Sequence, residues 1–149
     1  GYGISKGIEM VKLRITAALA LVLFGTPGLA QDGPRGIAFV QAPEQGGGIA
    51  TGASMEEAFT KATDQCMESG ALAEDCIKTN WCFPAGWTVD IFVQHREGPH
   101  WHEVICGLPS KAAAQATALH VCDRSERDYL IECSPVQFYD EQGVAQMKN

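Results

Sequence analysis

The chain has 149 residues, of which 18 are acidic and 11 are basic, and its formal net charge at pH 7 is −7. From Gln31 onward there are 17 acidic and 8 basic residues, a net charge of −9. Such a surface repels phosphate groups, which argues against nucleic acids and anionic membranes as partners. The length fits one small domain with a modest core.

The N-terminal segment carries the pattern of a secretory signal peptide. Residues 1–9 precede the first methionine and are interpreted as an upstream extension, and residues 10–30 follow as the leader. The leader has a basic start, a ten-residue apolar stretch at 15–24 and small residues before a cleavage site after Ala30. A bilayer-spanning helix needs about 20 apolar residues, so this stretch is too short.

The predicted mature protein is therefore a single exported domain at residues 31–149, periplasmic or secreted, with no membrane span after cleavage. Its ordered core is expected at about residues 36–139.

The first half of this domain is predicted to run from strand to helix to strand. Residues 36–40 indicate a strand, and the glycines at 46–48 are interpreted as a break in regular structure, without the Lys-Ser/Thr of a phosphate loop. Ser54 and Glu57 form a capping box that starts a helix ending near Ser69–Gly70. Residues at helical spacing predict its inward face, namely Met55, Ala58, Phe59, Ala62 and Cys66. Residues 76–82 then read as a strand.

The second half is predicted to contain a hairpin, a helix and a closing strand. Residues 87–94 alternate like a half-buried strand, and 100–106 return as its partner. Ser110 caps a second helix, whose predicted inward residues are Ala114, Ala118, Val121 and Cys122. Residues 129–133 form the closing strand, and the chain from Pro135 onward is expected to be an edge segment and a fraying tail.

A spacing that occurs twice relates the two halves. Serine, alanine, alanine and cysteine stand four residues apart at 54–66 and again at 110–122, and a second cysteine follows each block. Six cysteines in a small exported chain predict a disulfide framework, for which 15 pairings are possible. The repeat favours Cys66–Cys76 and Cys122–Cys133 as equivalent bridges, which leaves Cys82–Cys106.

These elements predict an α+β fold. We expect a mainly antiparallel sheet with two helices on one face, built from a pseudo-duplicated helix–strand unit and stabilised by disulfides.

The order of these motifs resembles a family of small exported bacterial domains of unknown function that share a doubled alanine-rich helix and this cysteine layout. The similarity covers roughly residues 36–134. It rests on Ile37-Ala-Phe39, the two Ser–Ala–Ala–Cys blocks, Cys76 before a strand, and Cys82-x2-Ala85-Gly86-Trp87.

Relatives that share Phe39-Val-Gln-Ala-Pro-Glu-Gln45 and Trp101-His-Glu103 are sometimes labelled 5-aminolevulinic acid synthase, so the resemblance implies that label. The residues do not support it. That synthase resembles larger pyridoxal-phosphate enzymes with a Schiff-base lysine and a phosphate cup. The predicted mature chain has four lysines, at 61, 78, 111 and 148. Lys61 and Lys111 lie on the predicted helices beside their capped N-terminal turns, and Lys148 lies in the tail. No cofactor is predicted.

The hairpin offers the best candidate for a metal site. His100 and His102 project from the same face of a strand, and His95 lies across the turn. Three imidazoles could hold Zn²⁺ or Cu²⁺, with Glu103 or water completing the coordination. The alternative is a solvated hairpin tip.

Three tryptophans, Trp81, Trp87 and Trp101, surround the same hairpin, either as core residues or as an aromatic ligand-binding patch. No catalytic residues are predicted. The sequence favours a non-enzymatic exported domain that binds an envelope protein or a small ligand. A metal-binding protein and an enzyme, including the labelled synthase, are the alternatives.

Overall fold

The computed structural model describes residues 33–147. The predicted extension, the signal peptide and its cleavage after Ala30, and Lys148 lie outside the described residues. No helix in the described part of the chain is long and apolar enough to cross a membrane.

The first half of the described chain forms a three-stranded antiparallel sheet with one helix. Its strand order is β2-β1-β3. The elements are β1 (Gly36–Ala42), β2 (Gly46–Gly52), α1 (Met55–Glu68) and β3 (Ile77–Cys82), with a short 3₁₀ turn at Ala73–Asp75.

The second half repeats this plan with one strand added at an edge. Its strand order is β5-β4-β6-β7, and every pairing is antiparallel. The elements are β4 (Trp87–His95), β5 (His100–Leu108), α2 (Lys111–Val121), β6 (Leu130–Tyr139) and β7 (Ala145–Gln146).

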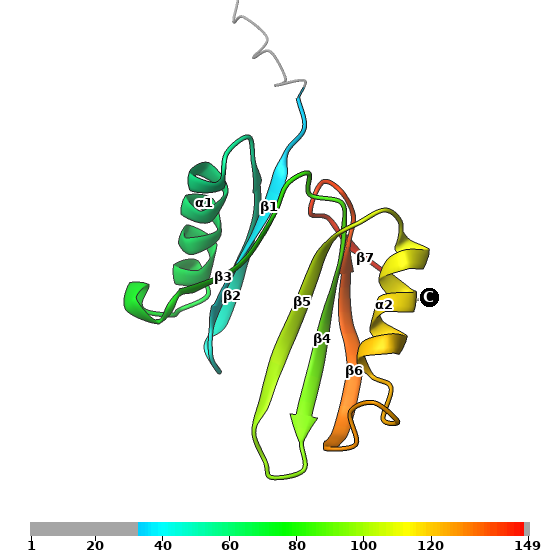
Figure 1. The fold of residues 1–149 in the computed structure, drawn as a ribbon. Coiled ribbons are helices and arrows are strands. Elements are labelled where there is room, and N and C mark those ends of the chain that lie inside the picture. The colour runs from blue at the N-terminus through cyan, green and yellow to red at the C-terminus, as the bar shows by residue number, and fades with distance from the viewer. Residues whose placement is uncertain (1–32, 148–149) are drawn as a thin grey trace, which may run out of the picture. The chain divides into compact units, whose positions relative to one another are not determined.

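The predicted α+β class, with antiparallel pairing and two helices, is confirmed, but the single sheet is wrong. There are two sheets, and each carries its own helix (Figure 1). The duplicated unit is also larger than predicted. It comprises a hairpin, a helix and a strand, and in both halves the first strand lies between the second and the third.

The predicted break in regular structure at glycines 46–48 is wrong. They begin β2, which pairs with β1 along its whole length from Gly36↔Gly52 to Ala42↔Gly46. The absence of side chains here serves helix packing. A Cβ on Gly48 would overlap the carbonyl oxygen of Ala62, and a Cβ on Gly52 would lie 2.8 Å from the backbone nitrogen of Ala58.

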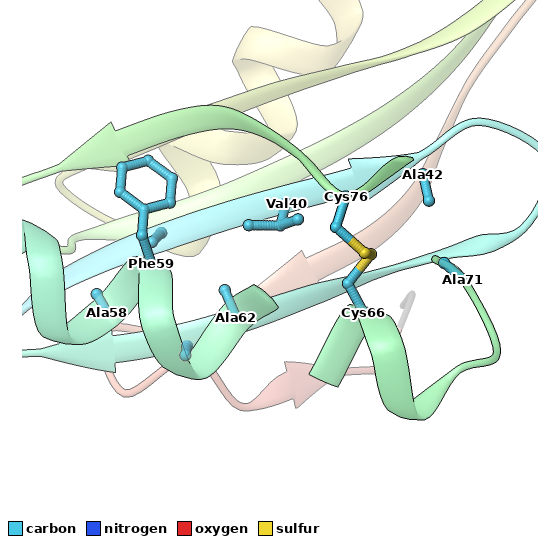
Figure 2. Packing of buried hydrophobic residues seen from close by; sticks show 10 residues of the cluster. Val40, Ala42, Ala58, Phe59, Ala62, Cys66, Ala71 and Cys76 are labelled. Atoms are coloured by element: carbon cyan, nitrogen blue, oxygen red, sulfur yellow. A yellow bond between two sulfur atoms is a disulfide. The ribbon is translucent and has the colours of Figure 1, made fainter. Parts of the chain in front are cut away.

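Helix α1 can approach β2 closely because small residues meet on both surfaces. Ala58, Ala62 and Cys66 of α1 are buried against β1 and β2 (Figure 2). Phe59 is also buried, as predicted, but Met55 is 54% exposed, so its predicted place on the inward face is wrong.

Both helices begin at the predicted caps. The Ser54 hydroxyl accepts the N–H of Glu57, as the capping box predicts, but the Glu57 carboxylate accepts the N–H of Ala53, one residue before the N-cap. Ser110 accepts the N–H of Ala113 in the same way. Helix α1 ends at its C-cap Ser69, as expected.

The three disulfides join the cysteines in the predicted pairs, and no described cysteine is free. Two of them lie within one half each: Cys66–Cys76 ties α1 to the start of β3, and Cys122–Cys133 ties the end of α2 to β6. The third, Cys82–Cys106, joins β3 of the first sheet to β5 of the second. The repeat therefore predicted the bridges inside the halves directly and the bridge between the sheets by elimination.

Buried residues form three cores, stacked from α1 to α2. One lies between α1 and the first sheet, and another between the second sheet and α2. The third lies between the two sheets and contains Ile37, Phe39, Ala85 and Val104. In Figure 1 the sheets accordingly lie between the two helices.

The C-terminal segment holds an inner strand and a further edge strand in place of the predicted edge segment and tail. Strand β6 continues through Pro135 to Tyr139 and pairs with β4 as an inner strand, while β7 supplies the edge. Proline is accommodated because the register shifts between Asp90 and Ile91, where β6 forms an irregularity. The predicted edge position is therefore wrong for residues 135–139, although they lie within the predicted ordered core.

Candidate cleft between the two sheets

A cleft of about 570 Å³ opens between the two sheets, beside the inter-sheet core. One wall comes from β1, β2 and the loop that joins them, and the other comes from β4, β5 and β6. Residues on the two walls include Phe39, Gln41, Ile49, Asp90, His102 and Tyr139.

Strand alternation decides which side chains reach this cleft. On β1, Ala38, Val40 and Ala42 pack toward α1, so Phe39 and Gln41 face the other way. On β4, Val89, Ile91 and Val93 pack toward α2, which directs Asp90 into the cleft. A carboxylate such as Asp90 can lie on one face of a buried strand only where the surface that it faces is polar or open to solvent.

The main polar feature of the cleft is a pair formed by Asp90 and His102. The Nδ1 atom of His102 lies 2.7 Å from Oδ1 of Asp90. The two residues are diagonal neighbours, because Asp90 pairs with Val104 and His102 pairs with Phe92. The Asp90 side chain is 19% exposed and that of His102 is 41% exposed, so the pair lies at the boundary between the cleft and solvent.

Tyr139 lies on the same wall and contacts the opposite one. Its ring meets Phe39 edge to face, with 6.0 Å between ring centroids. Burial, and then the negative charge of Asp90, raise the pKa of Tyr139 to about 12. The phenol is therefore neutral at physiological pH and retains its proton as a hydrogen-bond donor.

The structure does not bring the three predicted metal ligands together. Among the described residues no group of three or more His, Cys, Asp or Glu side chains is arranged to hold a metal ion. His95 stacks on Tyr129, with 5.0 Å between ring centroids, and its Nδ1 accepts the N–H of Glu97. His100 and His102 instead flank the ring of Phe92 at 5.7 and 5.8 Å.

The alternation of side chains along the strands explains why the three histidines do not meet. His95 is an odd-numbered residue of β4, on the side that packs toward α2, whereas His100 and His102 share the cleft face of β5. The turn brings the strands together but leaves His95 on the opposite face of the sheet. Glu103, the predicted fourth ligand, is held by Arg127.

The three tryptophans do not form one patch either. Trp81 packs on the core of α1, near Phe59 and Phe83, at centroid distances of 6.5 and 6.2 Å. Trp87 and Trp101 belong to the core beneath α2. The three do not form one patch because Trp81 lies in the first sheet and faces α1, whereas the other two lie in the second sheet and face α2.

Trp101 is held by a charged network beneath α2. Its Nε1 donates to Oε1 of Glu103 at 3.0 Å, and Arg127 binds both carboxylate oxygens of Glu103 at 2.6 and 3.1 Å. The Arg127 Nε donates to the hydroxyl of Tyr129. The hydrogen bonds from Arg127 lower the pKa of Glu103, although burial acts in the opposite direction.

This network predicts a pH-dependent loss of stability. Because the pKa of Glu103 is lower in the folded state, its stabilising effect is present above the unfolded-state pKa of about 4.3 and is lost as pH falls through the lower folded value. We expect Glu103→Gln to lower the free energy of unfolding by about 1–2 kcal/mol at neutral pH. The difference from wild type should shrink below about pH 4.

Urea denaturation between neutral and acidic pH measures this difference. The matched control is Glu126→Gln, an exposed carboxylate for which the structure shows no side-chain ion pair in the described residues. A difference between wild type and Glu103→Gln that stays constant with pH would contradict the role given to the Arg127 pair.

Asp90, Tyr139 and Gln41 are the cleft residues that the sequence analysis missed. Asp90 did give a signal, because it stands between Val89 and Ile91 in a strongly apolar strand. Such a residue points to a polar surface on one face of the strand, but its partners come from distant segments.

The chain was compared with protein-family models, curated proteins and solved structures, and none of them matches it. The resemblance to exported bacterial domains described above therefore stays a prediction.

Proposed function

We propose that this chain is an exported binding domain and that the cleft between its sheets takes a small ligand. Three disulfides fit an oxidising environment, as expected for a small exported domain. Placement in the periplasm or the extracellular medium, and membership of the exported family, are part of the proposal.

The cleft itself is the observation that carries the proposal. Its volume of about 570 Å³ falls within the roughly 300–1,000 Å³ typical of small-molecule sites. Its walls combine apolar side chains such as Phe39, Ile49 and Val104 with a few polar groups, which is the usual composition of a ligand site. Both halves of the duplicated fold contribute to it, so the site depends on the complete domain.

The composition of the walls favours binding over catalysis. Asp90 and His102 form an Asp–His pair of the kind that activates a nucleophile in hydrolases. The described residues that line the cleft include no Ser, Thr, Cys or Lys. We therefore propose a non-enzymatic role in which the pair orients a ligand.

Filling the cleft tests this proposal. We expect the oxidised wild-type protein, incubated with the low-molecular-mass fraction of its host's growth medium and envelope, to retain a small molecule in native mass spectrometry. Gln41→Trp places a large ring on the cleft wall and should reduce the bound fraction at least about tenfold, because the volume for the ligand is lost.

The matched control is Leu119→Trp, an exposed position of α2 outside the cleft lining, which should bind like wild type. Retention of the same molecule by Gln41→Trp would place the ligand elsewhere. Capture of an envelope protein equally by both variants would favour a protein partner on another surface.

A further inference from the structure

We infer that the ligand of the inter-sheet cleft is an organic cation, a primary amine or guanidinium attached to an apolar body, with Asp90 as its counter-ion. This inference rests on the proposed function and adds the chemical class of the ligand.

The charges of the cleft favour a cationic ligand. Its described lining residues include two carboxylates, Asp90 and Glu44, and no lysine or arginine. The chain as a whole has a net charge of −7. A concave site lined by one sign of charge concentrates its field and attracts ions of the opposite sign. An anionic ligand would be repelled by both carboxylates, and His102, the one basic side chain among the described lining residues, is already paired with Asp90.

The surroundings of Asp90 orient its carboxylate and shield it from water. His102 holds Oδ1 of this carboxylate at 2.7 Å, which fixes its orientation on the wall. The side chain is mostly buried, so water screens its charge less than that of a surface carboxylate. Burial, and then the charge of Asp90, raise the pKa of Tyr139 on the neighbouring strand of the same wall, so the carboxylate acts on the groups beside it.

The apolar residues around Asp90 define the rest of the ligand. Val104 lies on the same wall as the carboxylate, and Phe39 and Ile49 lie on the opposite wall. Aromatic rings also stabilise cations placed over their faces, and Phe39 and Tyr139 meet in this region. A bare inorganic cation would use only the carboxylates, whereas an amine with an apolar body would also contact Ile49 and Tyr139, which are partly exposed in the cleft.

Three probes that share one ring and differ in charge test the inference. They are 2-phenylethylammonium, neutral phenylacetamide and anionic phenylacetate, each titrated into the ¹⁵N-labelled, oxidised protein up to about 10 mM, a concentration that detects weak fragment binding. We expect the cation alone to shift the amide signals of Asp90, His102 and Tyr139.

Asp90→Asn removes the charge with little change in shape and should weaken binding of the cation at least about tenfold. Asp128→Asn is the matched control, because Asp128 is an exposed carboxylate paired with Arg96 away from the cleft lining. It should bind the cation like wild type.

Two results would overturn the inference. Equal binding of the neutral or anionic probe in the cleft would reject the cationic class while leaving the cleft as a ligand site. Unchanged binding of the cation by Asp90→Asn, or no shift of cleft amides with any probe, would reject Asp90 as the counter-ion. The Gln41→Trp experiment decides the proposed function independently of these outcomes.

Discussion

Reduction of the three disulfides is expected to unfold residues 33–147 at room temperature. The bridges span 10, 24 and 11 residues. In the loop-entropy model each closed loop of this size destabilises the unfolded chain by about 3 kcal/mol. Together the bridges contribute roughly 9 kcal/mol, while the net stability of a domain is about 5–15 kcal/mol.

The architecture makes this loss cooperative. Each sheet is small and has only one helix to cover it, so neither half buries a large core by itself. The Cys82–Cys106 bridge joins the sheets, next to a hydrogen bond from Asn80 Nδ2 to the carbonyl oxygen of Val104. Without that bridge the inter-sheet core loses its covalent tie.

Far-UV circular dichroism and urea denaturation, with and without a thiol reductant, measure the effect. Replacing one pair at a time by alanine provides the control, because each double variant should lose about 3 kcal/mol while keeping the other two bridges. A reduced protein with an unchanged urea midpoint would show that packing alone stabilises this fold.

Cysteine spacing and helix caps made much of the fold predictable. Ser54 with Glu57, and Ser110, are local signals that act within one helical turn, so the helix starts could be predicted from neighbouring residues. The repeat then constrained the pairing, because equivalent cysteines in equivalent units form equivalent bridges. These features depend little on how distant segments meet.

The errors concern contacts between distant segments. Three glycines normally indicate a break, and the close approach of α1 that requires a glycine at position 48 involves a segment more than ten residues away. The division into two sheets could not be predicted from the alternation of apolar residues, which gives the faces of a strand but not its neighbours. His95 shows the same limit, since the turn brings it near His100 while the pleat places it on the other face.

The cleft lay beyond prediction for a related reason. Its walls combine residues about fifty positions apart, such as Phe39 and Asp90, and no spacing in the sequence relates them. The sequence could identify Asp90 as an unusual residue in an apolar strand. It could not indicate that the opposite surface is a second sheet.

Gly48→Ala is expected to destabilise the domain strongly, by about 3 kcal/mol or more. A methyl group at this position would overlap the carbonyl oxygen of Ala62 and approach the backbone nitrogen of Cys66 to 3.0 Å. Both obstacles are backbone atoms of α1, so no side-chain rotation relieves the overlap. The helix has to move away from β2, which also strains its attachment through the buried Cys66–Cys76 bridge.

Urea denaturation of the oxidised variant measures this loss, and Gly33→Ala is the matched control. No atom lies within 4 Å of a Cβ built on Gly33, so the same chemical change should have little effect there. The loss of stability in Gly52→Ala should lie between those of the other two variants, since its Cβ would lie 2.8 Å from the backbone nitrogen of Ala58, a less severe overlap. If Gly48→Ala unfolded at the same urea concentration as Gly33→Ala, α1 could not lie as close to β2 as the structure places it. In that case the three glycines would be a loop feature, as the sequence alone indicates.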